Sequence, residues 1–112
     1  MARFISFFSY TTASVTSMIE RPSDRSAAAK ALVESLGGTM EAFYWMHGKH
    51  DGLLISNLPD GVAAAALSAA VGSTGAIDRI ETHQLFDHDE QSAIVKQAAT
   101  ARQAYRPPTA DR

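Results

Sequence analysis

The stretch T-M-E-A-F-Y-W-M-H-G-K-H-D-G-L-L-I-S-N, residues 39–57, decides the fold of this chain. It contains two apolar segments, 39–47 and 51–57, on either side of a tight turn at 48–50. Aromatic and branched aliphatic residues dominate both segments, which is typical of β-strands. Two strands joined by so short a connection pair as an antiparallel hairpin. The sequence therefore predicts a β-hairpin near the middle of the chain.

Further strands and helices are expected on both sides of the hairpin. Besides the hairpin, the predicted strands cover 3–11 and 76–86, and the predicted helices cover 12–20, 24–36, 61–71 and 87–103. Ser23 is expected to cap the second helix, and Asp60 the third. Gly37 and Gly38 are expected to end the second helix, because helices often end at a glycine in the left-handed conformation. The resulting element order is βαββαβ followed by a C-terminal helix.

This order predicts an α+β fold, a ferredoxin-like βαββαβ sandwich. Two right-handed crossovers interleaved in one antiparallel sheet give the spatial strand order 4-1-3-2. The strands at 3–11 and 51–57 then lie in the centre, and they are the most continuously apolar ones. We expect one domain over residues 1–104 and a flexible C-terminal tail over 105–112, which contains Pro107-Pro108.

Composition excludes several classes of protein. The 112 residues contain no cysteine, so disulfides, thiolate catalysis and cysteine zinc sites are excluded. The net charge is −2 and the basic residues are scattered, whereas nucleic-acid binding needs a dense positive surface. No apolar run is long enough to span a membrane, and no signal peptide is recognisable. We therefore expect a cytoplasmic protein with no nucleic-acid or membrane partner.

The hairpin turn resembles a motif of a known protein family. Residues 43–54 resemble the signature region of the GYD-domain family, whose members carry a Gly-x-Tyr-Asp-like turn leading into an apolar strand. Gly48 and Asp51 match that turn, and His50 stands where the family usually has tyrosine. The similarity extends over about residues 3–90. It implies a ferredoxin-like fold of the dimeric α/β-barrel type, and it does not imply a particular reaction.

The turn also holds the densest group of polar side chains. His47, Lys49, His50 and Asp51 lie within five residues, and they are candidate ligand-binding or acid–base groups. The histidines and Asp51, with His83, are also a possible metal site, but their spacing matches no zinc signature. The simpler interpretation is that the glycine shapes the turn and Asp51 hydrogen-bonds it. We favour no metal site and expect no particular cofactor.

Other candidate site residues lie on the strands. His83 shares a strand face with Glu81 and Arg79, and a carboxylate beside a histidine raises the pKa of the imidazole. Such a row is more often a solvated edge or an ion-pair network between subunits. Tyr44 and Trp45 are candidates for contact with a planar ligand, although aromatic residues on strands belong more often to a core or an interface.

Two kinds of function stay open at this point. The first strand is apolar on both faces, whereas a ferredoxin-like sheet has helices on one face only, so we expect a homodimer or higher homo-oligomer. The favoured function is a homo-oligomeric ligand-binding or assembly module, with a small molecule as the candidate ligand. The alternative is a small dimeric α/β-barrel enzyme, monooxygenase- or isomerase-like. In that enzyme His47, His50 and His83 are the acid–base groups and Asp51 orients them.

Overall fold

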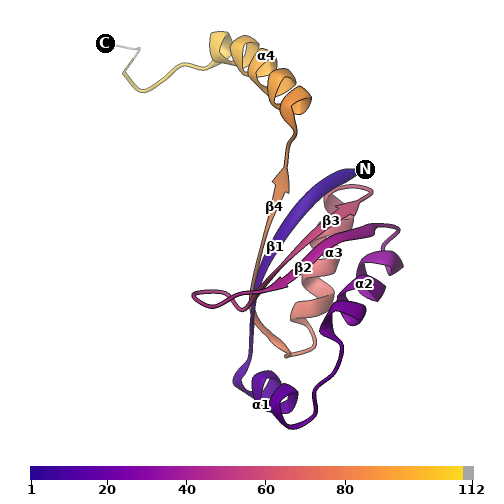
Figure 1. Cartoon of the computed structure of the whole chain (residues 1–112). Helices are drawn as coiled ribbons and strands as arrows, with labels where there is room; N and C mark the ends of the chain where they lie inside the picture. The colour runs from indigo at the N-terminus through magenta and orange to yellow at the C-terminus, as the bar shows by residue number, and fades with distance from the viewer. Residues whose placement is uncertain (110–112) are drawn as a thin grey trace.

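One four-stranded antiparallel sheet organises the molecule, in the spatial order β2-β3-β1-β4 (Figure 1). A computed structural model describes residues 1–109. The elements are β1 (Ala2–Tyr10), α1 (Thr12–Glu20), α2 (Arg25–Ser35), β2 (Thr39–Trp45), β3 (Gly52–Leu58), α3 (Gly61–Gly72), β4 (Ile77–Leu85) and α4 (His88–Ala104). The predicted order βαββαβ with a C-terminal helix is confirmed, and so is the strand order 4-1-3-2.

The hydrophobic core lies between the sheet and the helices α2 and α3. Along β1 and β3 the residues alternate between the two faces of the sheet, and those facing the helices are buried. From the other side α2 contributes Val33 and α3 contributes Leu67, which are 0% and 2% exposed. The buried apolar residues of this core are Phe4, Phe8, Val33, Leu54, Leu58, Ala64 and Leu67. Both crossover helices therefore cover the same face of the sheet.

A side-chain oxygen caps the N-terminus of every helix in the described part of the chain. The four caps are Thr11, Asp24, Asp60 and Asp87, and each accepts a hydrogen bond from the backbone N–H three residues later. The prediction that Ser23 caps the second helix is wrong. Asp24 has extended backbone angles, and its carboxylate accepts from the N–H of Ala27 at 3.0 Å. The helix accordingly starts at Arg25.

The two glycines after α2 serve different purposes. Gly37 has a φ of +81°, the left-handed conformation that glycine adopts most easily. Gly38 instead lets two backbones approach closely. A Cβ atom on Gly38 would lie 2.2 Å from the carbonyl oxygen of Asn57 in β3. Gly37 thus ends α2, and Gly38 lets the chain that follows pack directly against β3.

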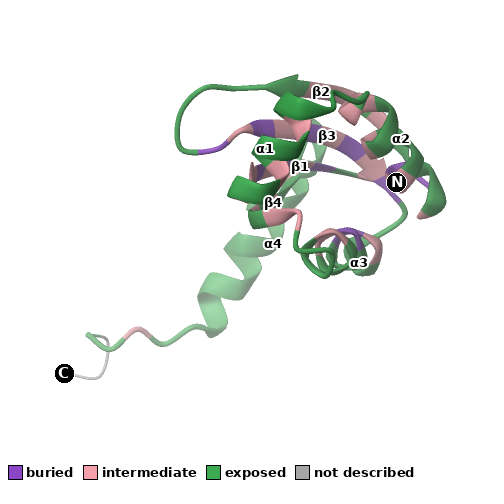
Figure 2. Ribbon diagram, turned by 90° about the horizontal axis from the view of Figure 1, so that it is seen from below, coloured by how far each residue is buried: buried purple, intermediate pink, exposed green. Residues whose placement is uncertain are grey.

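Helix α4 leaves the body of the domain. It follows the end of β4 and extends away from the sheet (Figure 1), and all of its residues are exposed (Figure 2). The radius of gyration is 18.2 Å, whereas a compact domain of about 100 residues has a value of about 13 Å. A capping box between Asp87 and Glu90 opens the helix. The predicted tail 105–112 follows α4, and its residues 110–112 lie outside the described part.

Candidate functional site

The face of the sheet that carries no helix presents three cross-strand rows of side chains. Residues paired across antiparallel strands share a face, so the register defines these rows. Following the order β2, β3, β1 and β4, the rows are Tyr44-Leu53-Phe7-Glu81, Ala42-Ile55-Ile5-His83 and Thr39-Asn57-Arg3-Leu85. We call this surface the open face. All twelve of these residues are half-buried or exposed, and no helix in the described chain packs over them.

The connection between β2 and β3 folds back onto the end of β1. Its last residue, Asp51, accepts a hydrogen bond from the Tyr10 N–H through Oδ2 at 2.8 Å. The Asp51 N–H donates to the Phe8 carbonyl at 2.8 Å, and its own carbonyl accepts from Met46. Ser9 donates to the carbonyl of Lys49 at 3.3 Å. The predicted tight turn at 48–50 is therefore part of a longer connection, from Met46 to Asp51, that is held in place by β1.

This connection places His50 against the open face. The imidazole is only 9% exposed, and its ring centroid lies 5.6 Å from that of Phe7. His83 lies near the same phenyl ring, with the centroids 6.4 Å apart. The Nδ1 atom of His50 is buried and has no hydrogen-bond partner among residues 1–109. A buried polar atom without a partner costs about 1–3 kcal/mol, which makes His50 the least satisfied side chain of this surface.

Glu81 completes a charged group around Phe7. His83 Nε2 and Glu81 Oε2 lie 2.9 Å apart, within hydrogen-bond distance. This hydrogen bond, with the charges of His83, His50 and Lys49, lowers the pKa of the Glu81 carboxyl. At the other end of the open face, Glu41 accepts hydrogen bonds from Asn57 and Arg3, at 2.6 and 3.0 Å. Those two contacts lower the pKa of Glu41 as well.

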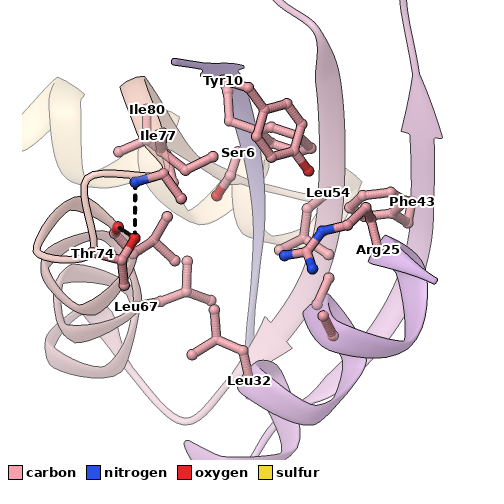
Figure 3. A pocket seen from close by; sticks show the side chains of 15 residues that line it. Ser6, Tyr10, Arg25, Leu32, Phe43, Leu54, Leu67, Thr74, Ile77 and Ile80 are labelled. Atoms are coloured by element: carbon pink, nitrogen blue, oxygen red, sulfur yellow. Dashed lines mark hydrogen bonds between the residues drawn. The ribbon is translucent and has the colours of Figure 1, made fainter. Parts of the chain in front are cut away.

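A second hollow lies on the opposite face of the sheet, between α2 and α3. Figure 3 shows its lining, which comes from both helices and from all four strands. The cavity has a volume of about 180 Å³. Most of the lining is apolar, and the charged side chain in it is Arg25, from the first turn of α2. The sequence alone does not predict this cavity, although Arg25 close to the small side chains of Ala28 and Ala29 is a local sign of space beside a helix.

Comparison with known families agrees with the architecture. The model of the GYD domain matches residues 4–95, which is most of the chain. The chain belongs to the GYD-domain family. No curated protein matches this GYD domain significantly.

The structure brings some of the predicted site residues of this GYD domain together and separates others. Lys49, His50 and His83 gather around Glu81, and Tyr44 lies in the same row of the open face as Phe7. Trp45 instead lies against Tyr10, with the ring centroids 5.4 Å apart and the ring planes tilted by 30°, and His47 is exposed in the connection.

The structure also bears on two alternatives that the sequence left open. Asp51 holds the backbone in place, as the simpler interpretation of the turn required. Within residues 1–109, no three His, Asp or Glu side chains lie close enough to hold one metal ion. No helix in the same part of the chain is long and apolar enough to cross a membrane.

Proposed function

We propose that this GYD domain is a homodimeric binding module in which a second copy of the chain covers the open face. The observation that carries the proposal is the apolar character of that uncovered face. Ile5 and Phe7 of β1 and Leu53 and Ile55 of β3 form its centre. Contiguous apolar surface of this kind on a small protein commonly marks an interaction site. Packing two identical sheets face to face is the simplest cover, because a two-fold axis needs one self-complementary patch.

The charges at the two ends of the open face suit such a dimer. One end carries the pair Arg3–Glu41, and the other carries Glu81 with His83. Lys49 adds a positive charge near Glu81, so both ends hold both signs of charge and a two-fold axis does not force like charges together. The apolar residues lie between these ends, as the core lies inside a polar rim in protein interfaces.

Helix α4 supports the same proposal. It carries Ile94 and Val95, which are 44% and 54% exposed, with Ala98 one turn further on. An isolated helix of this length is marginally stable in water and gains most of its stability from packing an apolar side. Because α4 extends away from its own sheet, the surface available to it belongs to the second copy.

Light scattering of the full chain tests the dimer. We expect a mass twice the 12.0 kDa of the chain. Ile55→Glu places a charge in the centre of the open face and should give the monomer mass. Val62→Glu is the matched control, because Val62 is 78% exposed on α3, and it should leave the dimer intact. A wild-type mass of one chain at every concentration would contradict the proposal. If Ile55→Glu fails to fold, Tyr44→Glu at the exposed edge strand serves instead.

A second candidate function rests on His50. Its buried Nδ1 atom needs a hydrogen-bond partner, and Glu81 and His83 nearby are groups that can exchange a proton. A small dimeric α/β-barrel enzyme with His50 and His83 as acid–base groups would use these features. Native mass spectrometry separates this function from the first. A ligand that stays bound to wild type and to His47→Phe, but is lost from His50→Phe, would favour the enzyme.

A further inference from the structure

The cavity between α2 and α3 exists because the two helices stand apart. Helix α2 packs mainly over β2, and α3 packs mainly over β4. The central strands β1 and β3 are therefore left partly uncovered on the helix side. Leu32 of α2 and Leu67 of α3 lie on opposite sides of the gap, near Leu54 of the sheet (Figure 3), and Phe8 also lines it. The small side chains of Ala28 and Ala29 do not fill the remaining space.

The polar groups of the cavity divide into satisfied and unsatisfied ones. The hydroxyl of Ser6 lies 2.9 Å from that of Thr82, and the Thr74 hydroxyl donates to the Val71 carbonyl at 2.8 Å. By contrast, neither the guanidinium of Arg25 nor the hydroxyl of Tyr10 has a hydrogen-bond partner in the described part of the chain. Figure 3 shows the Arg25 side chain reaching from α2 toward the space between the helices.

No acidic side chain lines the cavity, and Arg25 is half-buried without an ion pair among residues 1–109. A cation in this position is stabilised by an anion that the protein itself does not supply. Arg25 is also the first residue of α2, where the helix dipole favours negative charge. Apart from the hydroxyls of Ser6, Tyr10 and Thr74, the remaining side chains of the lining are apolar. The complementary ligand therefore has one anionic group and an apolar body.

We propose that this cavity binds a small monocarboxylate whose body is a single ring or a short branched chain. An apolar cavity of about 150 Å³ accommodates benzene, so about 180 Å³ suits a body of that size and excludes a long acyl chain. The carboxylate would accept hydrogen bonds from the Arg25 guanidinium, which presents its donors in a planar fork. The Tyr10 hydroxyl would donate to the same group. This proposal does not depend on the dimer, because the cavity and the open face lie on opposite sides of the sheet.

Trp45 provides a reporter for the test. It is the single tryptophan of the chain, and its ring contacts that of Tyr10, which lines the cavity. The full-length protein is titrated with benzoate and, separately, with the neutral analogue benzamide, while tryptophan fluorescence and backbone amide NMR shifts are recorded. We expect benzoate to shift signals of α2, α3 and β1 on the helix side and to bind more tightly than benzamide.

Two substitutions test the role of the cation. Arg25→Gln should weaken benzoate binding about tenfold or more, because a hydrogen bond to a charged group contributes about that much affinity, and it should leave benzamide binding unchanged. Lys30→Gln is the matched control. It removes an exposed cation from the same helix outside the cavity, and it should change neither affinity.

Ala29→Leu tests the cavity itself. The larger side chain occupies the space beside α2, so both probes should lose binding. The proposal is overturned if benzoate shifts no cavity signal up to its solubility limit. It is also overturned if Arg25→Gln and Lys30→Gln weaken benzoate equally, or if benzoate still binds fully to a folded Ala29→Leu variant. The mass of each sample, measured in parallel, keeps this result separate from that of the dimer.

Discussion

Replacing Gly38 with alanine tests the packing of α2 against the sheet more sharply than any other single substitution. The added methyl group would lie 2.2 Å from the Asn57 carbonyl oxygen, 2.8 Å from Leu58 Cδ2 and 3.2 Å from Val33 Cγ1. Carbon atoms do not approach that closely, so some part of the structure must move. The closest atom belongs to the backbone of β3, a central strand that is paired on both sides.

The surroundings of Gly38 decide the size of the effect. Leu58 and Val33 are 1% and 0% exposed, so neither can turn out into solvent. Adding a methyl group to a well-packed core costs about 1–3 kcal/mol. We expect the upper end, about 3 kcal/mol, because the nearest obstacle is a backbone carbonyl rather than a flexible side chain. Small domains have a total free energy of unfolding of about 5–15 kcal/mol, so this loss is large.

Urea denaturation followed by circular dichroism measures the loss of stability. With a slope of about 1–3 kcal/mol per molar urea, a loss of about 3 kcal/mol lowers the midpoint by about 1 M or more. All variants are compared at one protein concentration, because self-association would add to the apparent stability. Gly72→Ala is the control, since no atom lies within 4 Å of its added methyl group and alanine favours a helix by about 0.5–1 kcal/mol. A Gly38→Ala midpoint equal to that of wild type would refute the packing argument.

Three further substitutions probe the core, the connection and the charged group. Leu67→Ala should lower the free energy of unfolding by about 2–5 kcal/mol in the same assay, because the Leu67 side chain of α3 lies in the core and is 2% exposed. Asp51→Ala should cost about 1–3 kcal/mol, because it leaves the Tyr10 N–H without its acceptor, and its amide should then exchange faster in NMR. His83→Gln should raise the pKa of Glu81, seen by NMR titration of its carboxyl group. The depressed pKa means that the Glu81 contribution to stability is present above the unfolded-state pKa and is lost as the pH falls through the folded-state pKa. An unchanged Glu81 titration would show that the contact with His83 does not persist in solution.

The fold could be predicted from the sequence because its signals are local. Runs of aromatic and branched aliphatic residues in β1 and β3, glycines after α2 and capping residues before the helices depend on neighbours in the chain. The one wrong cap, Ser23, differs from the true cap by a single position. The prediction that the most apolar strands lie in the centre is confirmed, since β1 and β3 are each paired with a neighbouring strand along both edges.

The candidate site could be predicted only in part, because its geometry depends on contacts between distant residues. The sequence placed His50 in a tight turn, whereas Asp51 and Phe8 draw the connection back onto β1 and bury the imidazole. The cavity beside Arg25 depends on the distance between two helices, which no short segment encodes. Likewise, the sequence predicts α4 as a helix but does not show that α4 leaves the sheet.

The alternation of side chains along β1 has a consequence for how this protein can change. Phe8 and Tyr10 face the cavity, while Ile5 and Phe7 face the opposite way, on the open face. One nine-residue strand therefore contributes to both surfaces, because successive residues of β1 face opposite sides of the sheet. In terms of the two proposals, a substitution at Phe8 or Tyr10 alters contacts in the cavity, one at Ile5 or Phe7 alters self-association, and neither alters both directly. Mutation can then change the helix-side surface and the open face independently of each other.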